Sequence, residues 1–80
     1  MFKEIFKISD ILSVCGGAIK VIGENKGTNE IGDNVRIGNE NDNFFYASVI
    51  DASITQKSIE ITLENFGEHE IKKGMVIYQS

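Results

Sequence analysis

The sequence has 80 residues, with 8 Lys and Arg against 12 Asp and Glu, so its formal net charge is −4. This length suits one compact core, and we expect residues 1–80 to form a single domain. A hydrophobic share of 41% with 25% charged residues is ordinary for a globular protein and too apolar for a disordered one.

The composition also argues against several classes of protein. No apolar run approaches the roughly 20 residues of a membrane-spanning helix, and the charged N-terminus is unlike a signal peptide, so we expect a cytoplasmic protein without membrane contact. Cys15 is the single cysteine and His69 the single histidine, so neither an internal disulfide nor a structural zinc site is expected, and no other cofactor is indicated. The sequence shows no basic stripe of the kind that nucleic-acid binders use.

The N-terminal segment is compatible with two structures. One set of apolar residues shares a face of a strand: Phe2, Phe6, Ile8 and Leu12. Another set falls at helical spacings: Ile5, Ile8, Ile11, Leu12 and Cys15. Gly16 is available to end a helix, so periodicity alone does not choose between the two.

The next segments favour β-structure. Residues 18–22 lie between glycines, and residues 35–37 alternate apolar and polar side chains after a turn signal, so both predict short strands. Residues 39–43 are rich in asparagine and acidic side chains that favour a turn. They lead into a longer β-rich stretch from Phe44 to Ile54.

The clearest periodic signal runs from Ser58 to Glu64, where Ile59, Ile61 and Leu63 alternate with polar residues. This pattern predicts a strand with one face in a core, and residues 75–78 predict a last strand. Several strands with turn signals every 8–12 residues or so favour an all-β fold. We expect a small closed antiparallel β-barrel of about six strands, since closure removes apolar edges.

One glycine-rich motif invites comparison with a phosphate loop. Gly16 and Gly17 are followed by Lys20, but the spacing of the phosphate-binding motif is absent. A tight turn is the favoured interpretation.

Two further combinations of residues resemble catalytic groups. Cys15 would need His69 as its base, but the acidic neighbours of His69 favour the charged imidazole, so a small structural cysteine is favoured. Glu60 and Glu64 share one face of the predicted strand and resemble an acid–base pair, yet their regular alternation with apolar residues favours a solvent-facing role.

Consecutive aromatic residues suggest a binding surface. Phe44, Phe45 and Tyr46 cannot all face inward in a strand, so at least one is expected to anchor a partner or stack on a base. Core packing with a tyrosine at the rim is the alternative. Acidic residues outnumber basic ones in residues 41–80, which favours a protein partner over RNA.

Three segments together resemble a known family. Residues 8–17 run from an apolar and acidic strand into two glycines, residues 27–38 lead through a Gly-Asp turn into a strand, and residues 71–77 lead through a glycine into the last strand. In this order they resemble the translation-factor β-barrel family, which includes the second domain of elongation factor Tu. The resemblance spans residues 5–79, implies a closed β-barrel and favours a strand at the N-terminus.

The resemblance extends only in part to the family's ligand pocket. Asp10 matches an acidic residue of the pocket that holds the aminoacyl end of tRNA, whereas Ser9, Leu12 and Ala18 replace the family's other residues there. No GTPase signature is present. The resemblance therefore implies one accessory barrel, and aminoacyl-tRNA binding is not expected.

We expect a non-enzymatic, stand-alone binding module that contacts a protein partner, as a monomer or a homodimer. The candidate partner-binding residues are Phe44, Phe45, Tyr46 and Phe66. An RNA-binding accessory of the translation apparatus is the alternative, and an enzymatic role would depend on Cys15 alone.

Overall fold

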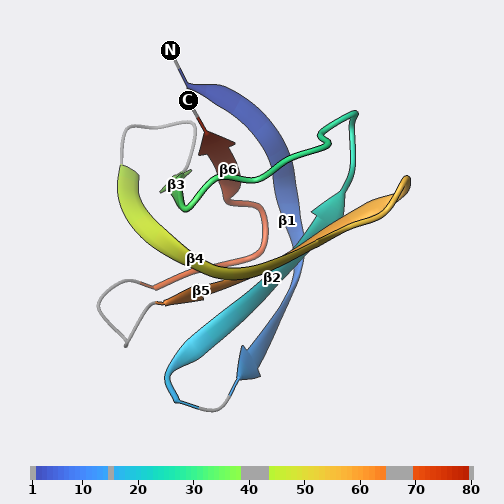
Figure 1. Cartoon of the computed structure of the whole chain (residues 1–80). Helices are drawn as coiled ribbons and strands as arrows, with labels where there is room; N and C mark the ends of the chain where they lie inside the picture. The colour runs from blue at the N-terminus through green and yellow to red at the C-terminus, as the bar shows by residue number, and fades with distance from the viewer. Residues whose placement is uncertain (1, 15, 39–43, 65–69, 80) are drawn as a thin grey trace.

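The computed structural model describes residues 2–14, 16–38, 44–64 and 70–79, which form six antiparallel strands. The strands are β1 (Lys3–Val14), β2 (Ala18–Glu24), β3 (Asn34–Gly38), β4 (Phe44–Ile54), β5 (Ser58–Glu64) and β6 (Val76–Gln79). They pair in the order β1-β2-β5-β4-β3-β6, and β6 pairs in turn with β1, so the sheet closes into a ring (Figure 1). The expected all-β fold is confirmed, and the N-terminal segment is a strand rather than a helix.

Two long strands close the ring because each changes its partner along its length. The first part of β1 pairs with β6 and the rest with β2, while β4 pairs first with β3 and then with β5. Both long strands contain register shifts, which let a strand bend sharply. The shifts lie between Glu4 and Phe6, between Ile8 and Asp10, and between Val49 and Asp51. No helix in the described ranges is long and apolar enough to cross a membrane.

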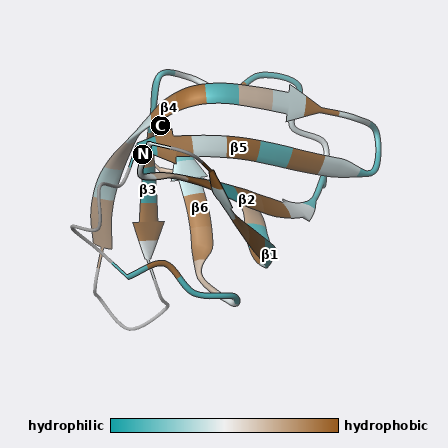
Figure 2. Ribbon diagram, turned by 90° about the horizontal axis from the view of Figure 1, so that it is seen from below, coloured by the Kyte–Doolittle hydropathy of each residue, from teal (hydrophilic) through white to brown (hydrophobic). Residues whose placement is uncertain are grey.

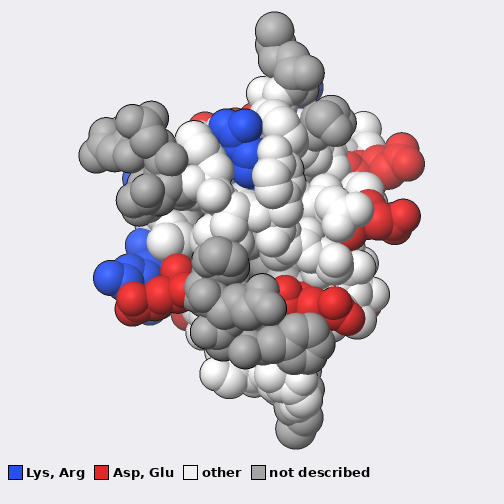
Figure 3. All heavy atoms as spheres, turned by 90° about the vertical axis from the view of Figure 1, so that its left-hand side faces the viewer, with Lys and Arg blue, Asp and Glu red and all other residues white. Residues whose placement is uncertain are grey.

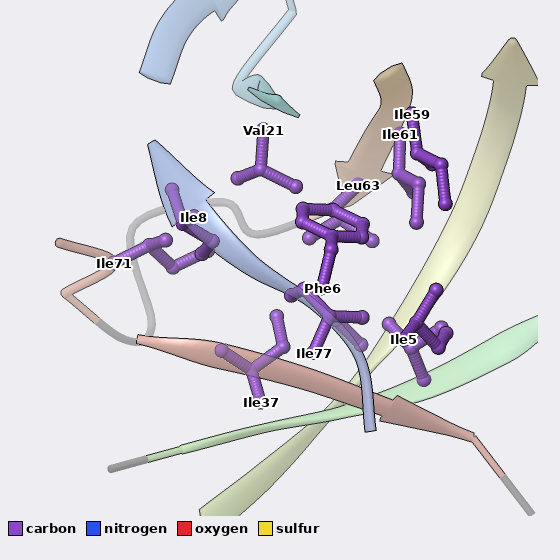
Figure 4. Close-up of a cluster of buried hydrophobic side chains, with 12 residues drawn as sticks. Ile5, Phe6, Ile8, Val21, Ile37, Ile59, Ile61, Leu63, Ile71 and Ile77 are labelled. Atoms are coloured by element: carbon purple, nitrogen blue, oxygen red, sulfur yellow. The ribbon is translucent and has the colours of Figure 1, made fainter. Parts of the chain in front are cut away.

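The inner face of the ring is an aliphatic core with one aromatic ring at its centre (Figure 4). Its fully buried side chains are Phe6, Ile8, Val21, Val35, Ile37, Ile59, Ile61, Leu63 and Ile77. The alternation predicted for β5 is confirmed, and hydropathy alternates visibly along this strand in Figure 2. Only Ala47 of β4 joins the buried core cluster, so this strand presents most of its side chains to the rim or to solvent.

The β1 strand departs from simple alternation. Ile5 and Phe6 are adjacent in sequence and both buried, because the register shift beside them turns both side chains inward. Two members of the predicted strand face, Phe2 and Leu12, are 36% and 49% exposed. The prediction that these alternate residues form the inner face therefore holds in the middle of the segment, at Phe6 and Ile8, and fails at its ends.

Gly23 of β2 makes room for the Phe6 ring. A Cβ atom at this position would overlap the ring and lie 2.6 Å from the carbonyl oxygen of Lys7. Gly23 pairs with Ile8 on one side and with Ile59 on the other, so it lies where β1, β2 and β5 meet. Only a residue without a side chain fits there.

Asn25 joins the segment after β2 to the turn between β4 and β5. Its Nδ2 donates hydrogen bonds to the carbonyl oxygens of Thr28, at 3.1 Å, and Thr55, at 2.7 Å. Its Oδ1 accepts hydrogen bonds from the backbone N–H groups of Gly27, at 2.9 Å, and Thr28, at 2.8 Å. One side chain thus satisfies four backbone groups that the strands leave unpaired.

The close approach of Phe6 to Gly23 gives a test of the packing. Gly23→Ala should destabilise the fold by about 1–3 kcal/mol, because the methyl group must displace a buried ring and backbone. The midpoint of thermal unfolding should fall by about 5–20 °C. Gly32→Ala is the matched control, since its Cβ would approach only Gln79 Oε1, at 4.0 Å. Equal midpoints for the two variants would contradict this packing.

The role of Asn25 can be tested by changing a single group. Asn25→Asp keeps the two accepted hydrogen bonds, loses both donated ones and places a carboxylate against two carbonyl oxygens. We expect a loss of about 1–3 kcal/mol in urea unfolding. Asn29→Asp adds the same charge at an exposed position of the same segment and should change stability little. The assignment fails if both variants unfold at the same urea concentration.

Candidate functional site

A row of four side chains crosses the outer face of the sheet over β1, β6, β3 and β4. The register pairs Glu4 with Tyr78, Tyr78 with Arg36, and Arg36 with Tyr46. Arg36 points outward because both of its neighbours in β3 are buried in the core. Strand pairing thus brings together residues from both ends of the sequence.

Aromatic rings surround the guanidinium group of Arg36. Its Cζ lies 3.8 Å from the ring centroid of Phe44, 4.4 Å from that of Phe2 and 5.5 Å from that of Tyr78, all within cation–π range. The Phe44 and Tyr78 rings meet edge to face with centroids 5.9 Å apart, and the Phe2 and Tyr46 rings are tilted at 6.0 Å. We call these five residues the aromatic–arginine patch: Phe2, Arg36, Phe44, Tyr46 and Tyr78.

The pairing of β3 with β4 explains how the Phe44 ring reaches Arg36. Phe44 lies opposite Gly38, two residues beyond Arg36 in β3. Gly38 and Arg36 lie on the same face of β3, so pairing with Gly38 brings the Phe44 ring next to the guanidinium group.

Arg36 has no ionic partner within the described part of the chain. Its Nε is buried and has no hydrogen-bond partner, and no ion pair among the described residues includes it. Glu4, the carboxylate in the same row, lies 3.9 Å from Lys26 Nζ instead. On the side of the molecule in Figure 3, a basic group in the upper part is bordered by uncharged surface, and acidic groups lie below it and at the right margin. The patch thus carries a positive charge that no described carboxylate neutralises.

The predicted aromatic run divides between the two faces of β4. Phe44 is 39% exposed and Tyr46 is 66% exposed, and both belong to the patch. Phe45, between them, is half-buried and packs against the core. Phe66 lies outside the described residues. The sequence therefore identified two members of the patch, and the alternation of the strand explains why Phe45 is not a third.

Three members of the patch were not predicted: Phe2, Arg36 and Tyr78. Alternation already indicated that Arg36 faces outward, since it stands between two apolar residues. Nothing in the local sequence showed that β3 would lie between β4 and β6, and this pairing is what brings Arg36 to the aromatic residues.

Asp10, the ligand-pocket candidate that the resemblance suggested, lies outside the patch. It is exposed on the part of β1 that pairs with β2, opposite Ile22. Its Oδ1 accepts a hydrogen bond from the backbone N–H of Ile11 at 2.9 Å and lies 3.8 Å from Lys73 Nζ. A ligand-binding role for Asp10 stays a prediction.

The glycine pair forms the tight turn that the sequence favoured. Gly16 and Gly17 both have φ near +86° and connect β1 to β2, in a backbone region that suits glycine. Lys20 lies within β2, paired with Leu12 and Thr62 rather than at the turn.

The other candidate reactive groups are not brought together in the described part of the chain. Glu60 and Glu64 alternate with buried residues of β5, as expected for its outer face. Cys15 and His69 lie outside the described residues. Within the described ranges, no group of three or more His, Cys, Asp and Glu side chains could hold a metal ion.

A hollow of about 270 Å³ lies between the start of β1 and the loop after β2. Its lining includes Lys3, Glu4, Lys26 and Glu30, so both signs of charge face it and neither is concentrated.

Comparison with protein-family models, curated proteins and solved structures gives no significant match. The strongest lead to function is therefore the aromatic–arginine patch.

The exposure of Tyr46 predicts that it contributes little to folding. Tyr46→Ala should change the free energy of unfolding by less than about 1 kcal/mol, because most of the side chain is in solvent. Ile37→Ala, a fully buried residue of the adjacent strand, should cost about 2–5 kcal/mol. Urea unfolding of both variants is the measurement, and Phe66→Ala extends it to the remaining candidate anchor. A large loss for Tyr46→Ala would make the tyrosine a structural residue.

Proposed function

We propose that this chain is a non-enzymatic binding module that contacts a protein partner through the aromatic–arginine patch. The observation that carries the proposal is the exposure of aromatic rings around an arginine without an ionic partner among the described residues. Tyrosine, phenylalanine and arginine are enriched at the centres of protein interfaces, where a few such residues supply most of the binding energy. Strands β3, β4 and β6 carry Arg36, Phe44, Tyr46 and Tyr78, and a paired backbone under these side chains lowers the entropic cost of binding.

The fold also supports a finer proposal, that the closed sheet is a translation-factor-type barrel. The three resembling segments fall on β1, on the loop and strand of β3, and on the segment that ends in β6. Such a barrel in a larger complex would dock beside a GTPase, as the second domain of elongation factor Tu does beside its nucleotide-binding domain. In this proposal the partner is a cytoplasmic protein.

RNA binding is the alternative function. Exposed aromatic rings stack on bases, and an arginine beside them adds attraction for nucleic acid. The net charge of −4 disfavours it, because binding to a phosphate backbone needs several basic groups on one face. Arg36 is the only basic residue of the patch.

The two functions are separated by capture from native lysate. Immobilised wild-type chain should retain a protein that mass spectrometry identifies, and Tyr46→Ala should lose it. Leu12→Ala is the matched control, because it also removes an exposed apolar side chain but lies on β1 outside the patch. Retention of the same protein by Tyr46→Ala would show that the patch is not the interface.

The same eluates should be examined for nucleic acid. RNA that is retained at low salt, released steeply as salt rises, and lost with Tyr46→Ala would replace the protein-binding proposal with the RNA-binding one. Sedimentation of the purified chain adds the third outcome: a dimer that Tyr46→Ala disrupts would identify the patch as a homodimer interface.

A further inference from the structure

We infer that the aromatic–arginine patch binds a peptide segment in which an acidic residue stands beside apolar residues, with Arg36 holding the carboxylate. This inference rests on the protein-binding function proposed above and names the chemistry of the partner. It combines the unpaired charge of Arg36, the closeness of the aromatic rings and the charge of the whole chain.

The hydrogen-bonding capacity of Arg36 is unused in the described part of the chain. A guanidinium group carries five N–H donors. The ring centroids of Phe44 and Phe2 lie 3.8 and 4.4 Å from Cζ. An aromatic face attracts the cation electrostatically but does not act as an ordinary hydrogen-bond acceptor for its N–H groups. No described residue accepts a hydrogen bond from Nε, which is buried. Because Nε is buried, an external acceptor would have to reach the terminal Nη groups of the guanidinium instead.

A carboxylate is the acceptor that fits this group best. Rings packed against a guanidinium group remove part of its hydration, and a charge-assisted hydrogen bond compensates for that loss. The planar fork of arginine matches the two oxygens of a carboxylate, and the flanking rings restrict the rotamers of Arg36 before binding. Glu4, the acidic group of the same row, is near Lys26 at 3.9 Å and lies on the far side of Tyr78.

The rings around Arg36 specify the neighbours of that carboxylate. Phe2, Phe44 and Tyr46 are each more than a third exposed; the rings of Phe2 and Phe44 pack against the guanidinium group, and Tyr46 contacts Phe2. A partner residue whose carboxylate reaches Arg36 therefore places its own neighbours against aromatic surface. Apolar neighbours gain from that contact, whereas charged ones lose hydration.

The charge of the chain favours one carboxylate over a polyanion. A chain with net charge −4 repels a nucleic-acid backbone, whose many phosphates meet the whole surface. A single carboxylate within an apolar segment interacts mainly with the local positive charge of Arg36. We therefore assign the patch to an acidic, apolar peptide segment of another protein.

A displayed library of random short peptides, selected on immobilised wild-type chain, tests the inference directly. The selected peptides should share an Asp or Glu beside apolar residues. Synthetic versions with Asp changed to Asn, or Glu to Gln, should bind the wild-type chain at least about tenfold more weakly by fluorescence polarisation.

Variants of the chain should reproduce this loss. Arg36→Met keeps the length and apolar stem of the side chain and should weaken binding of the acidic peptides by about tenfold or more. Arg36→Lys keeps the charge without the planar fork and should bind with intermediate affinity. Lys20→Met is the matched control, since it removes one positive charge from β2 and should leave the affinity unchanged. If Arg36→Met does not fold, two measurements still test whether Arg36 holds the carboxylate. These are the affinity of Arg36→Lys and the binding of wild-type chain to the peptides with Asp changed to Asn or Glu to Gln.

The outcomes separate this inference from the proposed function. Selected peptides that lack acidic residues but lose binding with Tyr46→Ala overturn the inference and leave the protein-binding function standing. Peptides that bind Tyr46→Ala as well as wild type, or a library that yields no binder, count against both. A Tyr46-dependent dimer in sedimentation assigns the patch to a second copy of the chain and overturns the inference.

Discussion

The ring of Phe6 occupies the space that a side chain at residue 23 would fill, and the closed sheet depends on this contact. Phe6 is fully buried and lies next to the point where β1 leaves β6 and begins to pair with β2. Gly23 lets the two strands approach at that point, and it pairs with β5 on its other side. One large side chain opposite one missing side chain thus fixes where β1 bends and where three strands meet. The aliphatic residues of the other strands then pack around the ring (Figure 4).

Closure of the sheet limits how the molecule can bind another protein. Open sheets often recruit a partner by adding a strand to an exposed edge, where backbone groups supply the hydrogen bonds. Each of the six strands described here already has two neighbours. β1 and β4, however, pair with their two neighbours over different parts of their length, so stretches of both strands keep one unpaired edge. On the outer face, the cross-strand row through Arg36 is the place where aromatic and charged chemistry meet.

The sequence predicted the strands better than their arrangement. Alternation identified β5 and the outward direction of Arg36 because each depends only on neighbouring residues. The burial of both Ile5 and Phe6 escaped prediction because a register shift breaks the two-residue period that such predictions assume. The patch was found only in part, because Arg36 meets Phe2 and Tyr78 through pairings between strands distant in sequence. Local pattern carries no information about which distant strands will be neighbours.

The pairing of β1 with β6 has a consequence for how the aromatic–arginine patch is maintained. These strands come from opposite ends of the sequence, and their register joins Lys3 to Gln79 and Glu4 to Tyr78. We call this pairing of β1 with β6 the seam. It holds Phe2 and Tyr78 beside Arg36, so the patch forms only once β6 has paired with the rest of the sheet. Fraying of a strand end generally requires less free energy than global unfolding. Fraying at the ends of the seam, beyond the buried pair Phe6 and Ile77, would therefore separate Phe2 and Tyr78 from Arg36 while the rest of the sheet stays paired. The proposed recognition can then be lost well before the protein unfolds.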